Sequence, residues 1–187
     1  MKVFHLSNKR VLLSFVHSTE SSGAGNEPSA DQDDGEGMDM DDEEGEGAMM
    51  ANSIAVECVG FCNSNMPWVG SGGMDQNLKI WDLNNGQLRV SCAHESAVVT
   101  LKWHQTLPLV TTACLDHAVR IWDARDGTQV VMLTGHSQPI TFLTSASFSL
   151  NEQSTTAKEL EAVVSVADDS TARLFVLDLH NILSNKN

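Results

Sequence analysis

Short apolar runs, each bounded by glycine, asparagine or aspartate, recur along most of the chain from residue 54 onward. Runs of roughly four to eight residues between turn signals predict β-strands, here two sets of four and then a set of three. The expected strands are 54–61, 67–72, 78–83 and 87–92, then 97–103, 109–114, 118–123 and 128–133, then 140–145, 162–167 and 171–177. Gly86 and Gly127 each belong to a turn between the last two strands of a four-stranded set.

The segment from Gly72 to Asp82 is repeated in altered form from Ala113 to Asp123, and both copies end in Ile-Trp-Asp. Three landmarks recur in step: Trp81 and Trp122 are 41 residues apart, Asp75 and Asp116 are 41 apart, and His94 and His136 are 42 apart. A period of about 40–45 residues with a Trp-Asp dipeptide is typical of a β-propeller blade. Residues 1–6 and 10–16 align with the third and outer strands of such a blade, whose first two strands are missing.

The predicted fold is therefore an all-β partial propeller, open at both ends, with a disordered acidic insert. The expected division is 1–17 for the last two strands of a truncated blade, 18–52 for the insert, 53–94 and 95–136 for complete blades, 137–179 for a blade without its outer strand, and 180–187 for a tail. A polar stretch at 151–158 is expected as a further insertion. Propellers close with about four to eight blades, so we expect the chain to be part of a longer protein or to be completed by partner chains.

The net charge of −14 is concentrated in residues 31–46, which hold ten acids and no Lys or Arg and leave −4 for the rest. These acids are Asp31, Asp33, Asp34, Glu36, Asp39, Asp41, Asp42, Glu43, Glu44 and Glu46. The mildly acidic remainder disfavours direct binding of nucleic acid, which requires clustered Lys and Arg. No apolar run reaches the roughly 18 residues of a membrane span. Four cysteines do not indicate a disulfide scaffold, so we expect an intracellular, cytoplasmic protein, with the nucleus as the alternative compartment.

The acidic insert has three readings. It is either a solvated loop, or a docking segment that attracts a basic partner over a distance, or a calcium loop with Gln32, Asp34, Glu36 and Glu43 at ligand positions. The glutamine at the first position and the absence of flanking helical patterns argue against calcium. We therefore expect no cofactor.

Each blade offers the same polar set: a His before the first strand, a hydroxyl four residues before an Asp, and a Trp six residues after that Asp. The members are His17, Ser71, Asp75 and Trp81, then His94, Thr112, Asp116 and Trp122, then His136, Ser165 and Asp169. Ser/His/Asp sets would suit a hydrolase, but one enzyme rarely carries several copies of a triad. In the structural interpretation, the Asp carboxylate accepts a hydrogen bond from the imidazole of His. The imidazole is held against the hydroxyl, and the hydroxyl in turn contacts the indole N–H of Trp. Phe175 replaces Trp in the third set, so we expect that blade to be less rigid.

The remaining cysteines and histidines show no metal-ligand spacing. Cys58 and Cys62 would lie about 13 Å apart along one strand, too far to share a Zn²⁺ ion, and they are interpreted as buried apolar residues. We expect surface or turn positions for the histidines outside the repeated set, which are His5, His104, His117 and His180.

With these residues in view, the chain resembles WD40-repeat proteins over residues 1–17 and 53–178, and within them the carboxyl-terminal half of the angio-associated migratory cell protein family. The resemblance depends on residues 55–62 ahead of Met66-Pro67, on the Trp-Asp repeats, on residues 115–125, and on the acidic insert ahead of the first of these. It implies a non-enzymatic scaffold of about seven or eight blades, linked to cytoplasmic signalling and cell migration, with a related yeast protein that escorts a basic ribosomal protein. The family's amino-terminal blades are missing here.

The expected function is therefore a non-catalytic scaffold for protein–protein interaction, whose acidic insert attracts a basic partner such as a ribosomal protein. A substrate adaptor for a ubiquitin ligase is the alternative, and a hydrolase is a third reading.

Overall fold

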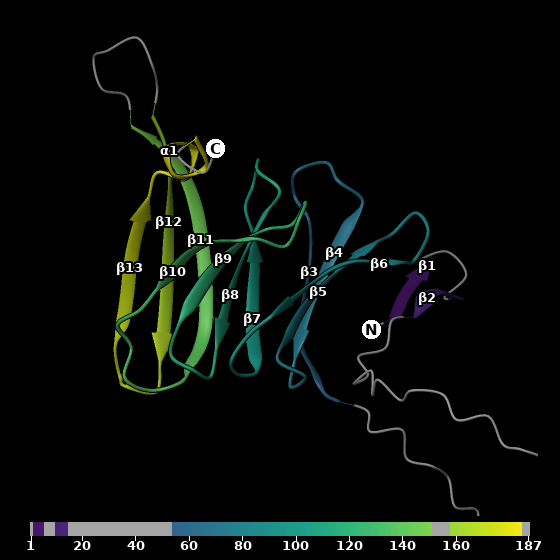
Figure 1. Cartoon of the computed structure of the whole chain (residues 1–187), viewed down its shortest axis with the longest axis horizontal. Coiled ribbons are helices and arrows are strands. Elements are labelled where there is room, and N and C mark those ends of the chain that lie inside the picture. The colour runs from purple at the N-terminus through teal and green to yellow at the C-terminus, as the bar shows by residue number, and fades with distance from the viewer. Residues whose placement is uncertain (1, 6–9, 15–53, 151–157, 185–187) are drawn as a thin grey trace, which may run out of the picture.

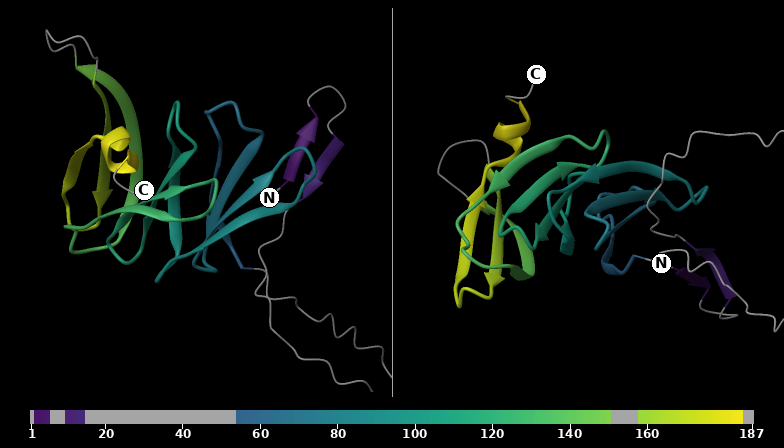
Figure 2. Two further views of the ribbon diagram at one scale, coloured as in Figure 1. Left: turned by 45° about the horizontal axis from the view of Figure 1, so that its top comes forward. Right: turned by 60° about the horizontal axis from the view of Figure 1, so that its bottom comes forward.

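The computed structural model of the chain describes residues 2–5, 10–14, 54–150 and 158–184. These residues form four antiparallel sheets and one short helix. Figures 1 and 2 show the sheets side by side in a curved row, with β1 and β2 at one end and β11 to β13 at the other. The described sheets do not close into a barrel. His17 and the acidic residues of 31–46 lie outside the described residues.

The strands follow one another in simple up-and-down order within each sheet. The first sheet pairs β1 (Lys2–His5) with β2 (Arg10–Ser14). The second contains β3 (Val56–Phe61), β4 (Trp68–Gly73), β5 (Asn77–Asp82) and β6 (Leu88–Ala93). The third contains β7 (Val98–Trp103), β8 (Leu109–Cys114), β9 (Val119–Asp123) and β10 (Gln129–Leu133). The fourth has only β11 (Ile140–Leu150), β12 (Lys158–Ala167) and β13 (Ala172–Leu177).

Most strands begin and end within two residues of the predicted positions, but β11 and β12 are longer than predicted. Their pairing continues to Leu150 opposite Lys158, so the predicted ends at 145 and 162 are wrong. The added part is rich in serine and glutamate and lacks an apolar run. Apolar and polar residues alternate here, as in Ala146-Ser147-Phe148-Ser149, which is a strand pattern of period two that a search for apolar runs does not detect.

Helix α1 (Leu179–Ser184) follows β13 and reaches into the residues predicted as a tail, for which no helix was expected. Asp178 caps this helix, since its Oδ1 accepts from the backbone N–H of Asn181 at 3.0 Å. Leu179 is buried against Leu109 of β8 and Ile121 of β9. The chain thus folds back toward the β7–β10 sheet instead of adding a fourth strand beside β13.

Each large sheet has two faces, because successive side chains in a strand point in opposite directions. We call the face that carries Ser71, Thr112 or Ser165 the hydroxyl face, and the other the opposite face. Strand register places Trp81, Trp122 and Phe175 on the hydroxyl faces of their sheets, one strand away from the hydroxyl.

Neighbouring sheets pack with the opposite face of one against the hydroxyl face of the next. Leu78 and Ile80 of β5 lie in one apolar cluster with Leu101, Trp103 and Val110 of the next sheet. In the following junction, buried Ala113 and Val119 form a cluster with Leu143 and Val163.

The junction between the β3–β6 and β7–β10 sheets depends on a glycine. A Cβ added at Gly72 of β4 would lie 2.5 Å from Cγ1 of Val98 in β7, so only glycine lets the two sheets approach this closely. The indole N–H of Trp103 crosses the same junction and donates to the carbonyl oxygen of Gly60 at 2.8 Å.

Candidate functional site

His94 links two sheets through hydrogen bonds from both of its ring nitrogens. It lies between β6 and β7, with Nδ1 2.9 Å from the carbonyl oxygen of Cys92 and Nε2 2.9 Å from Oγ1 of Thr112. Trp122 Nε1 donates to the same Oγ1 at 3.1 Å. A carbonyl can only accept, so Nδ1 carries the proton and Nε2 accepts from the Thr112 hydroxyl. Burial lowers the pKa of His94 to about 4, and the Cys92 carbonyl opposes this only in part.

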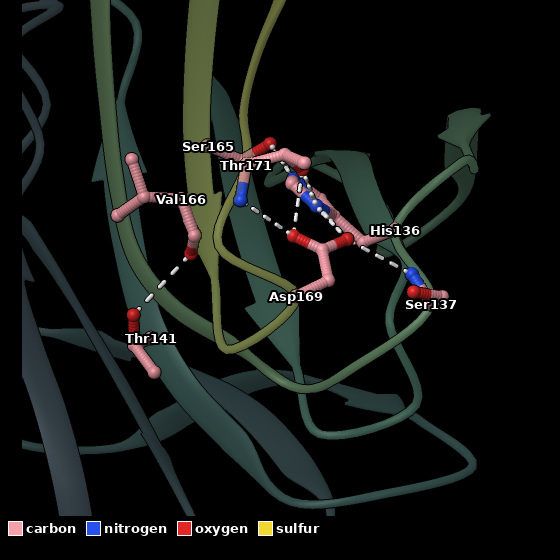
Figure 3. Close-up of polar contacts among 7 residues, drawn as sticks. All are labelled: His136, Ser137, Thr141, Ser165, Val166, Asp169 and Thr171. Atoms are coloured by element: carbon pink, nitrogen blue, oxygen red, sulfur yellow. Dashed lines mark hydrogen bonds and ion pairs between the residues drawn. The ribbon is translucent and has the colours of Figure 1, made fainter.

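His136 binds the connection between β10 and β11 to the β11–β13 sheet (Figure 3). It lies between β10 and β11, and its Nε2 is 2.9 Å from Oγ of Ser165. Its Nδ1 donates to Asp169 Oδ2 at 2.9 Å. Asp169 also accepts from the hydroxyl of Thr171 at 2.6 Å and from the backbone N–H of Ser137 at 3.0 Å. These hydrogen bonds hold the pKa of Asp169 well below its ordinary value, and the bond from Thr171 has the largest effect.

The predicted bond between His94 and Asp116 is wrong. Asp116 instead forms an ion pair with Arg120 at 2.7 Å and accepts from the backbone N–H of Ala118 at 3.2 Å. A charged guanidinium is a stronger partner for a carboxylate than a neutral imidazole. Burial by itself would raise the pKa of Asp116, but the bonds from Arg120 and Ala118 outweigh it and lower that pKa. The Cys92 carbonyl takes the place at His94 Nδ1 that the prediction gave to Asp116.

The set in the β3–β6 sheet is described only in part, because His17 lies outside the described residues. Trp81 Nε1 donates to Oγ of Ser71 at 2.8 Å, in the way that Trp122 donates to Thr112. Lys79 Nζ lies 2.9 Å from Asp75 Oδ2, a pair that corresponds to Arg120 and Asp116 one repeat later.

A further polar contact between sheets is absent from the sequence-based prediction. His104 lies in the connection after β7 but is buried, whereas a surface or turn position was expected for it. Its Nδ1 accepts from the backbone N–H of Leu107 at 3.0 Å, so Nε2 carries the proton and faces Glu161 Oε2 of β12 at 3.1 Å. Ser147 donates to the same oxygen at 2.7 Å. One sequence signal could have indicated this contact: Glu161 lies two residues before the core residue Val163 and therefore on the same face of the strand.

Burial would raise the pKa of Glu161, but the hydrogen bonds from His104 and Ser147 outweigh it and keep that pKa below its ordinary value. Glu161 is therefore a carboxylate at neutral pH, held between two sheets by two donors. This contact positions the β11–β12 hairpin on the β7–β10 sheet.

The four cysteines are free, with Cys92 and Cys114 buried and Cys58 and Cys62 half-buried rather than fully buried as interpreted. Burial raises the pKa of Cys58, Cys92 and Cys114 to about 12, so these thiols are protonated and poor nucleophiles. Among the described residues, no three His, Cys, Asp or Glu side chains gather in a group that could hold a metal ion.

The other predicted histidines do not belong to a common site. His117 occupies a turn with a φ of 69°, and His180 of α1 pairs with Glu159 at 3.2 Å on the surface. His5 lies in β1. No helix among the described residues is long and apolar enough to span a membrane.

The chemistry of the repeated set follows from where its hydroxyls lie. Ser71, Thr112 and Ser165 are each fully buried. A nucleophile has to reach a substrate atom, whereas each of these buried oxygens is held by a hydrogen bond to a Trp or His side chain. The geometry suits a structural role, and His94 in addition joins two sheets.

Comparison with known proteins identifies the repeat. The family model described as "WD domain, G-beta repeat" matches residues 50–82 and 86–123. The chain carries WD40 repeats. Its fold is similar to the crystal structure of Saccharomyces cerevisiae Sqt1, with a TM-score of 0.56 and 19% sequence identity over 66% of this chain and 30% of that one. The predicted all-β partial propeller is thus confirmed.

Relatives with curated descriptions agree with the resemblance. The angio-associated migratory cell proteins of Homo sapiens and Canis lupus familiaris are each 37% identical to 125 residues of this WD40 chain. That match covers 67% of this chain but only 26% of either relative. An uncharacterised WD repeat-containing protein of Schizosaccharomyces pombe is 31% identical over 93 residues, which is 50% of this chain and 23% of that protein.

Proposed function

We propose that this chain acts as a non-catalytic scaffold for protein–protein interaction. The observation that carries this proposal is the use of the repeated polar residues in hydrogen bonds inside the fold, with each hydroxyl fully buried. The WD40 repeats and the similarity to angio-associated migratory cell protein support the same class of function.

Replacement of His94 separates this proposal from a hydrolase. The scaffold predicts that His94→Ala lowers the free energy of unfolding by about 1–3 kcal/mol, because Thr112 loses a buried hydrogen-bond partner. A hydrolase would lose turnover of a model ester while keeping its stability. Urea unfolding followed by tryptophan fluorescence, beside an ester-hydrolysis assay of both proteins, distinguishes the two outcomes.

We further propose that the partner is a basic protein, of the chemical kind found among ribosomal proteins, and that residues 31–46 attract it. Ten carboxylates without a compensating Lys or Arg support this proposal, because a local excess of one charge speeds encounter with the opposite charge. An escort for a basic protein would need such a segment to hold its cargo away from nucleic acid.

The test is a pull-down from lysate at low and at high salt with two chains of equal length. One is the natural chain, and the other has the ten acids of 31–46 replaced by Asn or Gln. Basic proteins that bind the natural chain at low salt, and are lost in either the neutral variant or high salt, would support the proposal. Identical sets of partners in all four samples would exclude the acidic attraction.

A further inference from the structure

The hairpin of β11 and β12 extends past the other strands of its own sheet and of the β7–β10 sheet (Figure 1). Repeat alignment equates β3 and β7, of six residues each, with residues 140–145 of β11. Residues 146–150 have no counterpart in those strands, and they continue the pairing with β12 as far as Leu150 opposite Lys158. We call residues 146–150 and 158–161 the arm. A neighbouring sheet with strands of the usual length would end short of it.

One face of the arm is held by contacts to other parts of the chain. Glu161 Oε2 lies 3.1 Å from His104 Nε2 and accepts from the hydroxyl of Ser147 at 2.7 Å. Glu159 Oε2 lies 3.2 Å from His180 Nε2 of α1. These contacts fix the position of the arm before any ligand binds, so that little conformational freedom remains to be lost on binding.

β11 leaves one edge of the arm without a partner strand. It is the first strand in the order of its sheet, and among the described strands it pairs only with β12. The described sheets pack on one another through their faces, so a further sheet in the row would not pair with this edge. About every second residue of 146–150 therefore directs its backbone N–H and C=O away from β12.

This edge also lacks the features that normally prevent an exposed strand from pairing with another chain. Such features include charged side chains, proline and bulges. The equivalent strands each carry an exposed charge, Glu57 in β3 and Lys102 in β7, whereas the eleven residues of β11 include no charged residue and no proline. The register of β11 with β12 is regular throughout the arm. The open edge of the arm is therefore suited to accept another strand.

We propose that the β11 edge of the arm binds an extended segment of a protein partner as an added β-strand. The backbone of that segment pairs with residues 146–150, and one of its apolar side chains packs beside Phe148, which is 37% exposed. The net charge of −14 disfavours a second copy of this chain at the edge and favours a segment flanked by Lys or Arg. This binding rests on the proposed scaffold function, but it does not require residues 31–46.

Random peptides displayed on phage, selected against the full 187-residue chain, serve as the probe. Binding of the selected peptides is measured by isothermal titration calorimetry. Phe148→Lys and Ser149→Lys alter opposite faces of the same strand, and each should weaken binding by about tenfold or more, because a lysine on the edge opposes strand addition. Gln129→Lys is the control, since it places the same charge on an exposed position of β10 and should leave binding unchanged. Far-UV circular dichroism tests that each variant is folded.

Methylation of the peptide backbone tests strand pairing without any change in the protein. N-methyl groups at every second position of a selected peptide should abolish binding, and the same groups at the intervening positions should have little effect, because only alternate N–H groups face β11. Equal effects at all positions, or a loss of binding through Phe148→Lys alone, would overturn the proposal, because the peptide would then contact a face and not the edge.

Two further results would also overturn the proposal. One is a dimer of the natural chain that Ser149→Lys dissociates, because a second copy would then occupy the edge. The other is a selection that enriches no peptide. Neither result decides the scaffold function itself, which the comparison of stability and turnover in His94→Ala tests separately.

Discussion

The hydroxyl of Thr112 is the contact through which two aromatic rings and two sheets meet. It accepts from Trp122 Nε1 and donates to His94 Nε2, in a position fully removed from solvent. Thr112→Val keeps the shape of the side chain but removes the partner of the Trp122 N–H and of His94 Nε2. We expect the free energy of unfolding to fall by about 2–3 kcal/mol.

Urea unfolding of Thr112→Val and of the natural chain measures this loss. Thr144→Val is the matched control, because Thr144 is exposed on β11, and its change should stay within about 0.5 kcal/mol. Equal effects of the two substitutions would show that the buried hydroxyl is not the stabilising group.

His94 also predicts how stability depends on pH. Its pKa is about 4 in the folded chain against an ordinary 6.5, because burial disfavours the charged ring. The unfolded chain therefore binds more protons between these values, and stability is lost as pH falls from about 6.5 toward 4. The loss from this residue is at most about 3 kcal/mol.

Unfolding of the natural chain and of His94→Gln at a series of pH values checks this prediction. The natural chain should lose more stability than the variant between pH 6.5 and 4, and the two curves should run parallel below that range. The lowered pKa of Asp169 affects stability only near and below its ordinary value of 3.8, so the two effects separate. Parallel curves throughout would contradict the role given to His94.

At the scale of elements, equivalent turns differ in what surrounds them. Gly86 and Gly127 have nearly the same φ, 72° and 74°, in the β5–β6 and β9–β10 turns. A Cβ at Gly127 would also lie 2.4 Å from Cγ1 of Val90, across the junction between sheets. Gly127→Ala should therefore lower the free energy of unfolding by about 1–2 kcal/mol more than Gly86→Ala does. In Gly86→Ala only the positive φ is unfavourable, whereas Gly127→Ala adds the steric clash with Val90.

A second substitution identifies the cause of that difference. Val90→Ala removes the methyl groups that a new Cβ would meet, so its combination with Gly127→Ala should be less harmful than the sum of the two single changes. Chemical unfolding of the four proteins in this cycle gives the coupling. Strict additivity would mean that contact with Val90 is not the source of the cost.

Strand positions could be predicted from the sequence wherever apolar runs and turn residues coincide, as in β8, which was predicted to the residue. The added lengths of β11 and β12 were missed, because their apolar residues alternate with serine and glutamate instead of forming an apolar run. Helix α1 was missed for a similar reason. Its six residues are too few to form a stable helix alone, and Leu179 is fixed by Leu109 and Ile121 from distant strands.

The candidate site divides in the same way. The recurring spacing of His, hydroxyl and Trp predicted which residues meet, since each repeat places them at fixed points on strands. It did not reveal that Asp116 would form an ion pair with Arg120 instead of a hydrogen bond with His94, because that pairing depends on side-chain geometry. Nor did it reveal the contact of His104 with Glu161, which joins residues far apart in the chain that have no repeat equivalent.

Across the whole molecule, the three large sheets should differ in rigidity. All residues of β8 and β9 are buried, whereas alternate residues of β13 are exposed. The aromatic residue on the hydroxyl face of the β11–β13 sheet is Phe175, which has no N–H to donate to Ser165. Amide protons of β12 and β13 should therefore exchange with solvent faster than those of β8 and β9.

Phe175→Trp should restore the missing donor, because Trp122 and Trp81 reach the equivalent hydroxyls at 3.1 and 2.8 Å. One added hydrogen bond contributes about 1 kcal/mol, which slows exchange in β12 and β13 by about fivefold. Hydrogen exchange followed by mass spectrometry measures this change. The same substitution in a Ser165→Ala background is the control, since no hydroxyl is left to accept. If exchange slows equally in both backgrounds, the larger ring, and not its N–H, makes the sheet more rigid.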